Sequence, residues 1–332
     1  MDLQAAKQAV AIVNSKRAVD PVQRALNRIE QPAKTFEAHL NWFVEEIVET
    51  QKSEKTRYEW KRQCKHIENK FGSKPIGDID RRAITEFLDG FPGRASNQYR
   101  SLLRQIFTHA VARGDCEHNP VLGTLARDAE VQRQRLTLEG FKAILAKAQP
   151  WFQRAMMLAL WSLQRREDLV AMRIEHWSNG KLSVRQKKVE GYGSGRLRIT
   201  PGPLLQSVLD NCLNSAERTN PESIVHECPF LVHRIPEKRR KATGKEHFGQ
   251  LLPEALSRAF QEARDRLPMF QSMSEAARPT FHEIRALGGD LYRTEHGWTT
   301  EQIQALMGHA SSKMTREYLD RHGERWHDVV AG

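Results

Sequence analysis

A polar segment near the middle of the chain limits the fold, because it separates two stretches that must each form their own core. After Asn119-Pro120, residues 123–134 (GTLARDAEVQRQ) are charged and poor in large apolar side chains, which is typical of a linker. With 332 residues, 39% of them hydrophobic, the chain can form two domains. We therefore predict a domain over residues 34–122, a linker over 123–134 and a second domain over 135–332. Residues 1–33 form an N-terminal extension, with short helices expected at Gln4–Lys16 and Pro21–Ile29.

Apolar residues at helical spacing predict a four-helix bundle between residues 34 and 122. Asp80 is expected to cap the third helix and Ser96 the fourth, while Gly72 and Gly114 are expected just after helix ends. The predicted inward positions are Leu40, Phe43, Val44, Ile47, Trp60, Cys64, Ile67, Phe71, Ala83, Ile84, Phe87, Leu88, Tyr99, Leu103, Ile106, Phe107 and Ala110.

The second domain is predicted to mix helices with one β-hairpin. Its strands are Lys181–Lys187 and Arg196–Thr200, joined by the glycine-rich residues 190–195. A first helix opens at Thr137, and further helices are expected at Trp151–Ser162, Glu167–Arg173, Pro203–Cys212, Pro253–Leu267, His282–Glu295, Thr300–Leu306 and Ser312–Leu319. The fold class is thus mainly α with a small β-hairpin.

The charge of the chain predicts a polyanionic partner. Lys and Arg number 52 against 41 Asp and Glu, which gives a net charge of +11 and a pI near 9.6, above the value of about 9 typical of nucleic-acid-binding domains. Basic residues concentrate in Gln51–Lys70 and Arg234–Lys245. The candidate contacts to the backbone of such a polyanion, which are the predicted DNA contacts if the partner is DNA, are Lys61, Arg62, Lys65, Arg100, Arg104, Lys238, Arg239 and Arg240.

Several other classes of protein are not indicated. No apolar run approaches the ~18 residues of a membrane helix, and the N-terminus lacks a signal-peptide layout, so a cytoplasmic protein is expected. The four cysteines are widely spaced and form no C-x-x-C, so neither disulfides nor a zinc knuckle are predicted. His282-Glu283 resembles the start of a zinc-protease helix, but Ala286 stands where the second histidine would be. No metal site and no cofactor are expected.

Four residues near the C-terminus suit the chemistry of phosphodiesters. His282, Arg285, His309 and Tyr318 are separated by 3, 24 and 9 residues. A tyrosine hydroxyl, with an ordinary pKa of about 10, is a poor nucleophile at neutral pH unless cations surround the phosphorus that it attacks.

Two further elements lie upstream of these four residues. Arg165 is followed three residues later by Asp168, and Lys188 stands at the end of the predicted hairpin strand. With His282, Arg285, Gly308-His309 and Tyr318, this set resembles the tyrosine recombinases, the phage-integrase family, over about residues 135–325. Arg166 is a second guanidinium and the alternative to Arg165, although the register to Asp168-Leu169 favours Arg165. Lys187 is the alternative to Lys188, and only one of these two lysines can face the phosphate, because side chains alternate faces along a strand. Leu163 departs from the glycine that the family usually has.

The resemblance implies a site-specific DNA recombinase that forms a 3′-phosphotyrosine intermediate at Tyr318 without metal or ATP. It implies that Arg165 and Arg285 hold the phosphate, Asp168 supports Arg165, Lys188 protonates the leaving group, His282 assists the tyrosine proton and His309 positions the phosphate. Residues 34–122 resemble the helical, SAM-like core-binding domain, which would clamp double-stranded DNA together with the catalytic domain.

The expected biological setting follows from the same resemblance. The partners would be DNA core sites, other copies of the chain in a homotetramer, and DNA-bending accessory proteins, in the cytoplasm or nucleoid of a bacterial host. Integration and excision of a phage or mobile-element genome is the expected task. The alternatives are a host enzyme that resolves chromosome dimers, a type IB topoisomerase, and a DNA-binding accessory protein with an idle site. The tail over residues 319–332 could pack on a neighbouring protomer or on its own domain.

Overall fold

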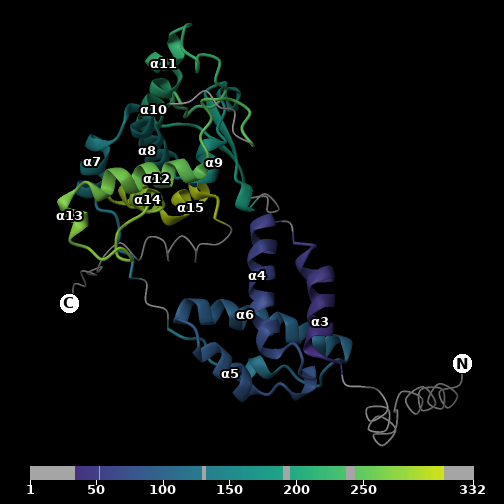
Figure 1. Ribbon diagram of the computed structural model, residues 1–332. Coiled ribbons are helices and arrows are strands. Elements are labelled where there is room, and N and C mark those ends of the chain that lie inside the picture. Colours follow the sequence, from purple (N-terminus) through teal and green to yellow (C-terminus); the bar gives the residue numbers. More distant parts are fainter. Residues whose placement is uncertain (1–33, 52, 129–131, 190–194, 237–243, 310–332) are drawn as a thin grey trace, which may run out of the picture. The chain divides into compact units, whose positions relative to one another are not determined.

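The computed structural model describes residues 34–51, 53–128, 132–189, 195–236 and 244–309. The chain divides into two compact units, residues 1–131 and residues 132–332. Helices dominate both units (Figure 1), and the described strands all belong to one small sheet in the second. This confirms the predicted fold class.

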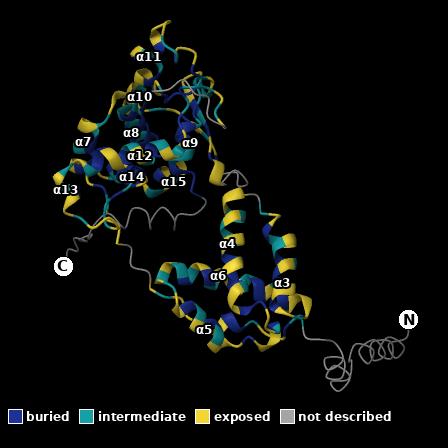
Figure 2. Cartoon of the chain, in the orientation of Figure 1, coloured by how far each residue is buried: buried dark blue, intermediate teal, exposed yellow. Residues whose placement is uncertain are grey.

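The first unit is a helical bundle around one apolar core. Phe36, Phe71 and Phe107 pack in its centre, with ring centroids 6.0 Å and 5.8 Å from Phe36. Figure 2 shows the alternation of buried and exposed faces along these helices. The helices are α3 (Phe36–Phe43), which continues into a π-helical turn (Val44–Val48), then α4 (Glu54–Phe71), α5 (Arg81–Asp89) and α6 (Gly93–Arg113), with 3-10 turns at Ile76–Asp78 and Pro120–Gly123.

Some of the predicted capping residues of this unit lie at helix ends, and one does not. Asp80 accepts a hydrogen bond from the Ala83 amide, which confirms it as the cap of α5. Gly114 follows α6 with φ 76°, as a left-handed glycine should. The prediction for Ser96 was wrong: the Ser96 amide already donates to the Pro92 carbonyl at 2.8 Å, and α6 begins four residues earlier than expected, with Pro92 as its N-cap. Gly72 does follow α4, but with right-handed φ −49°.

The second unit places a helical core beside a three-stranded antiparallel sheet. The strands are β1 (Trp177–Ser178), β2 (Lys181–Arg185) and β3 (Arg196–Ile199), in the order β1-β2-β3. The helices are α7 (Leu138–Lys147), α8 (Pro150–Ser162), α9 (Arg166–Val170), α10 (Pro203–Leu213), α11 (Ala216–Thr219), α12 (Pro253–Asp265), α13 (Pro268–Gln271), α14 (Glu283–Thr294) and α15 (Thr300–Met307). Thr137 caps α7 as predicted, by accepting from the Gly140 amide.

The sheet differs from the predicted hairpin in two ways. Strand β1 was not predicted, although Asn179-Gly180 carries the signal of a two-residue hairpin turn, and both residues have positive φ (50° and 69°). Strand β2 ends at Arg185, and Lys187–Val189 forms a 3-10 turn. The two lysines are therefore not on a strand, and strand alternation cannot decide between them. Helix α9 is also shorter than the predicted Glu167–Arg173, since it spans only Arg166–Val170.

Helices α8 and α14 pack closely against each other in the second unit. A Cβ atom on Gly288 of α14 would lie 2.1 Å from the Leu160 carbonyl oxygen of α8. No real side chain tolerates such a distance, so this close approach requires glycine at position 288. The approach fixes α14, which begins directly after His282 and carries Arg285.

Leu163 ends α8 in the left-handed conformation, with φ 54° and ψ 27°. This backbone explains why glycine is usual there, because a Cβ atom in that region costs about 1–2 kcal/mol. The Leu163 side chain is fully buried, which offsets the cost through apolar burial.

We predict that Leu163→Gly destabilises the protein less than Leu163→Ala. Both variants lose a buried leucine, a loss worth about 2.7–5 kcal/mol. Glycine, unlike alanine, also relieves the strain of the left-handed backbone, which is about 1–2 kcal/mol. Glycine stabilises the unfolded chain by only about 0.4–1 kcal/mol relative to alanine, so the relief of strain should be the larger effect. Urea unfolding of the full chain measures the difference.

Leu160 provides the matched control, since it is equally buried but lies inside α8. There the order should reverse, with Leu160→Gly less stable than Leu160→Ala by about 1 kcal/mol. If the glycine variant were less stable than the alanine variant at both positions, the backbone at Leu163 would not be strained.

Candidate active site

Arg165 and Arg166 point to different surroundings, although they are adjacent. Arg165 precedes α9, and its Nη1 donates to the Gln186 Oε1 at 3.3 Å. Arg166 donates to the Glu167 carboxylate at 2.9 Å and to the Ser257 hydroxyl of α12 at 2.7 Å. The guanidinium of Arg166 is thus held against α12, and the geometry favours Arg165 as the arginine that faces the other predicted site residues.

Two buried glutamines, which sequence reasoning missed, connect Arg165 to the end of α15. The Gln186 Nε2 donates to the Gln164 Oε1 at 2.6 Å and to the Met307 carbonyl at 2.9 Å. The Gln164 Nε2 donates to the Leu306 carbonyl at 2.8 Å. Their position next to Arg165 and next to the lysine pair was the available signal, but nothing in the sequence shows that they meet.

Arg285 and His309 meet at the same helix end. The Arg285 Nη2 donates to the Met307 carbonyl at 2.7 Å and lies 3.0 Å from the His309 Nε2. Because a guanidinium can only donate, the His309 Nε2 must accept, and the ring proton of the neutral imidazole resides on Nδ1. Gly308 allows this arrangement by ending α15 in the left-handed conformation, with φ 62°.

Both imidazoles are strongly biased toward the neutral form. Burial, together with Arg285, Arg165 and Lys188, lowers the pKa of His282 to about 4, although the residue keeps one side open to solvent. Burial and the same cations lower the pKa of His309 to about 3. Lys188 is among the cations that lower the pKa of both rings, so we expect Lys188 rather than Lys187 to face the site.

Asp168 supports the lysine turn more directly than it supports Arg165. Its Oδ1 accepts the Lys187 backbone amide at 3.0 Å. Its side chain is buried, which raises the pKa of the carboxyl, while the Lys187 amide and the charges of Arg165 and Arg285 oppose that rise. The expected support of Arg165 is therefore electrostatic, and the hydrogen bond that the described residues provide goes to the turn carrying Lys188.

Several predicted residues lie outside the described part of the chain. These are the nucleophile Tyr318, the basic residues Lys238, Arg239 and Arg240, the helices expected within residues 1–33, the glycine-rich hairpin tip, the helix Ser312–Leu319 and the tail over residues 319–332.

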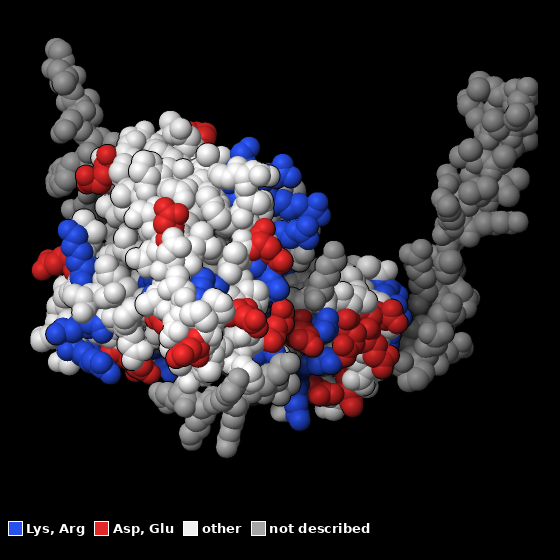
Figure 3. All heavy atoms as spheres, turned by 90° about the horizontal axis from the view of Figure 1, so that it is seen from above, with Lys and Arg blue, Asp and Glu red and all other residues white. Residues whose placement is uncertain are grey.

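Some of the candidate DNA contacts of the first unit are exposed, and others already bind protein groups. Lys65 and Arg104 are exposed on α4 and α6. Lys61 pairs with Glu49, and Arg62 pairs with Glu59 at 3.1 Å. Arg100 donates to the Thr124 carbonyl at 2.7 Å, so it holds the start of the linker segment. Figure 3 shows Lys and Arg side chains gathered in several groups on one face of the molecule, with acidic groups between them.

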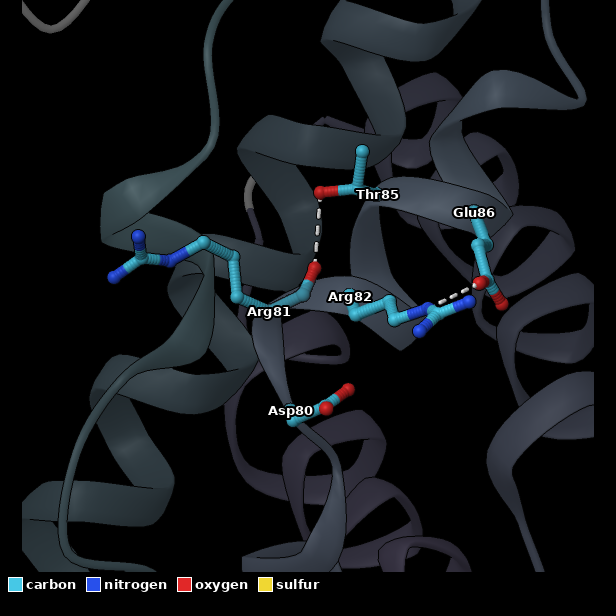
Figure 4. Close-up of a pocket in the computed structure, with 5 residues that line it drawn as sticks. All are labelled: Asp80, Arg81, Arg82, Thr85 and Glu86. Carbon is cyan, nitrogen blue, oxygen red and sulfur yellow. Dashed lines mark hydrogen bonds and ion pairs between the residues drawn. The ribbon is translucent and has the colours of Figure 1, made fainter.

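A hollow on α5 lies apart from these residues. Asp80, Arg81, Arg82, Thr85 and Glu86 line it (Figure 4). Arg82 pairs with Glu86 at 3.0 Å, while Arg81 points the other way, toward Gly123. None of the predicted catalytic residues lines this hollow.

The described residues offer neither a metal site nor a membrane span. They contain no group of three or more His, Cys, Asp or Glu side chains arranged to hold a metal ion. Within the same ranges, no helix is long and apolar enough to cross a bilayer.

Two models of known protein families match this chain, one in each unit. The Phage integrase family model matches residues 134–325, and the Phage integrase central domain model matches residues 36–124. The chain belongs to the phage integrase family. The family match contains every predicted catalytic residue, and this integrase-family chain is therefore a site-specific tyrosine recombinase of the kind that integrates and excises DNA.

Individual integrases support the same conclusion. The integrase of Escherichia phage HK022 is 28% identical over 282 residues, which cover 83% of this chain and 72% of the relative. The integrase of Escherichia phage lambda is 30% identical over 286 residues, with 83% and 73% covered. A lambda integrase tetramer bound to a Holliday junction superposes with a TM-score of 0.73 at 26% identity, covering 99% of this chain and 89% of that chain. A lambda integrase dimer on a COC′ core site, covering 90% and 100%, gives 0.72 at 26% identity.

We predict that the stability of this integrase-family chain decreases as pH falls below about 6.5, the ordinary pKa of histidine. The folded state holds the pKa of His309 at about 3, so below pH 6.5 only the unfolded chain takes up this proton, and unfolding becomes easier by up to about 1.4 kcal/mol per pH unit. Urea unfolding between pH 7.5 and 5 measures the slope.

His309→Gln should reduce that slope, because glutamine does not titrate and its side-chain oxygen can still accept from Arg285. The difference in unfolding free energy between wild type and variant should shrink as pH falls. Parallel stability curves would show that His309 is not held neutral in the folded state.

Proposed function

We propose that five described residues hold the scissile phosphate of double-stranded DNA while Tyr318 attacks it. The residues are Arg165, Lys188, His282, Arg285 and His309. The observation that carries the proposal is that Arg285 lies 3.0 Å from His309 and shares the Met307 carbonyl with Gln186, the partner of Arg165. Arg165, Arg285 and Lys188 also lower the pKa of both imidazoles. Such a concentration of positive charge, in a site with neutral hydrogen-bonding rings, suits a phosphodiester anion.

The proposed step exchanges one phosphoester bond for another. The Tyr318 Oη forms a bond to phosphorus while the bond from phosphorus to the DNA 5′-oxygen breaks, leaving a 3′-phosphotyrosine. His282 takes the phenolic proton, which its neutral form permits, and Lys188 gives a proton to the leaving 5′-oxygen. The free 5′-hydroxyl of a partner strand reverses the step, so no ATP is consumed.

The two arginines are proposed to bind the non-bridging phosphate oxygens. A planar guanidinium can present paired N–H donors to these oxygens, which an ammonium cannot do. The charge of the phosphodiester also opposes the effect of the arginines on His282, so DNA binding should raise the pKa of that ring toward the range of an effective base. His309 can donate from Nδ1, because its Nε2 accepts from Arg285. With Lys188, these cations supply the charge that metal ions provide elsewhere.

We further propose that the helical unit holds the duplex and that the active assembly is a homotetramer. Lys65 and Arg104 are the strongest candidates for phosphate contacts, since both are exposed, while Lys61 and Arg62 could exchange their carboxylate partners for phosphate. The solved lambda integrases, a dimer on a core site and a tetramer on a Holliday junction, support this assembly. DNA-bending accessory proteins and a bacterial cytoplasmic location stay predictions.

The similarity to phage and prophage integrases favours integration and excision over resolution of host chromosome dimers. The Escherichia coli prophage integrase IntE is 30% identical over 279 residues, covering 80% of this chain and 68% of the relative. A binding protein with an idle site would not need Arg165, Arg285, His282 and His309 to converge.

A nicked suicide duplex that carries the cognate site tests the proposal. Because the nick releases the short strand that bears the 5′-hydroxyl, the covalent intermediate cannot be religated and accumulates. Wild type should form a protein–DNA adduct, with or without chelator, and Tyr318→Phe should form none. An adduct with Tyr318→Phe, or none with wild type, would contradict the assignment.

Matched pairs of variants test the neighbouring choices in the same assay. Arg165→Lys should slow adduct formation by about 10²–10³-fold, the usual loss for one transition-state donor, whereas Arg166→Lys should affect mainly stability. Lys188→Ala should likewise be much slower than Lys187→Ala. If the Arg166 variant were slower than the Arg165 variant, the catalytic role would belong to Arg166. The same reasoning applies to Lys187 and Lys188.

A further inference from the structure

We propose that Gln186 is a positioning residue for strand cleavage, which fixes Arg165 against the turn that carries His309. The inference rests on the proposed function. It concerns a side chain that need not touch DNA: Gln186 is fully buried, and so is its partner Gln164.

The hydrogen bonds of Gln186 allow only one orientation of its amide. The Nε2 lies 2.6 Å from the Gln164 Oε1 and 2.9 Å from the Met307 carbonyl oxygen. Both neighbours are acceptors, so the NH₂ group must face them. The Oε1 of Gln186 then faces Arg165, from which it accepts at 3.3 Å.

Gln164 has its own orientation determined in the same way. Its Nε2 donates to the Ser162 carbonyl at 2.7 Å and to the Leu306 carbonyl at 2.8 Å. Its Oε1 is therefore turned toward Gln186. The hydrogen bonds run in one direction, from Arg165 through Gln186 and Gln164 to backbone carbonyls at the ends of α8 and α15.

The Gln186 amide packs directly against Gly308. A Cβ atom on Gly308 would lie 2.4 Å from the Gln186 Oε1. Glycine is needed there for the left-handed turn and also to admit this amide. Gln186 therefore sits directly against the residue that precedes His309, and at the start of the turn that carries Lys188.

The chemistry of the residue matters as much as its place. The site requires one neutral acceptor for Arg165 and two donors for its other neighbours, and a side-chain amide supplies both. A carboxylate at this position would present oxygen to the Met307 and Gln164 oxygens. It would also neutralise part of the charge that Arg165 offers to phosphate, so a neutral amide leaves the full charge of the guanidinium for the substrate.

Both arginines of the proposed phosphate site are positioned by the same carbonyl group, that of Met307. Arg165 is tied through Gln186 to the Met307 carbonyl, and Arg285 donates to the same carbonyl at 2.7 Å. Loss of the Gln186 link should misplace Arg165 relative to Arg285 without removing either charge. A displacement of about 1 Å at a reacting centre can cost about 10²-fold in rate.

The test uses the full chain and the nicked suicide duplex at saturating concentration, with Gln186→Met and Gln186→Glu as variants. Gln186→Met keeps the size of the side chain but makes no such hydrogen bonds. We expect its single-turnover rate of adduct formation to fall by about 10–100-fold, while its Kd for the duplex changes less than about threefold, because the DNA-binding charges remain.

Gln186→Glu supplies a readout that a merely structural role would not change. Its rate should be lowest at pH 8, and the ratio of its rate to the wild-type rate should rise as pH falls to about 5.5. A protonated glutamic acid regains one donor for the Met307 or Gln164 oxygen.

Gln153→Met is the matched control, since the Gln153 Nε2 also donates to a backbone carbonyl, that of Leu145, at 3.0 Å. It should lose stability without losing rate in the folded fraction. A wild-type rate for Gln186→Met at saturating DNA, or a loss no larger than its loss of folded protein, would overturn the proposal. If wild type itself formed no adduct, the proposed function would fail instead, so the two failures are distinguishable.

Discussion

The carbonyl groups of Leu306 and Met307, at the end of α15, are the point on which the site depends. They accept from Gln164, Gln186 and Arg285. The last carbonyls of any helix lack partners within the helix and carry partial negative charge. Here those free acceptors hold a guanidinium and two amides, so the end of a short helix organises residues that follow α8, follow β2 and lie in α14. The left-handed Gly308 then turns the chain so that His309 reaches Arg285.

This arrangement explains how strong positive charge and neutral imidazoles coexist. Burial disfavours a charged ring, and Arg285, Arg165 and Lys188 would also repel it, so the pKa of both histidines falls well below the ordinary value. The unliganded site therefore has an excess of positive charge. The protein is expected to lose stability at low pH, because the unfolded chain binds the histidine protons more readily than the folded one. In the proposed mechanism a phosphodiester would supply the missing negative charge, and its binding would raise the pKa of the two rings.

Much of the fold and of the site followed from local sequence rules, because caps and motifs act over a few residues. Asp80 and Thr137 cap helices as their chemistry predicts. Other features arise from tertiary contacts that no local pattern carries. Ser96 lies within a helix because Pro92 starts it earlier, and the burial of Leu163 sustains a backbone that its sequence disfavours. Gln186 meets Met307 from 121 positions away, so only the folded chain reveals it.

The central claim, a preassembled cationic site that keeps its histidines neutral until phosphate arrives, can be measured on the rings themselves. Nuclear magnetic resonance of the protein with ¹⁵N-labelled histidine reports the protonation of each ring nitrogen as pH changes. In the free protein His309 should stay neutral with unprotonated Nε2 throughout the range from pH 7.5 to 5, in keeping with a pKa of about 3. Binding of the site duplex to the Tyr318→Phe variant should move the His282 titration upward. A His309 ring that titrates near pH 6.5 in the free protein would contradict the account.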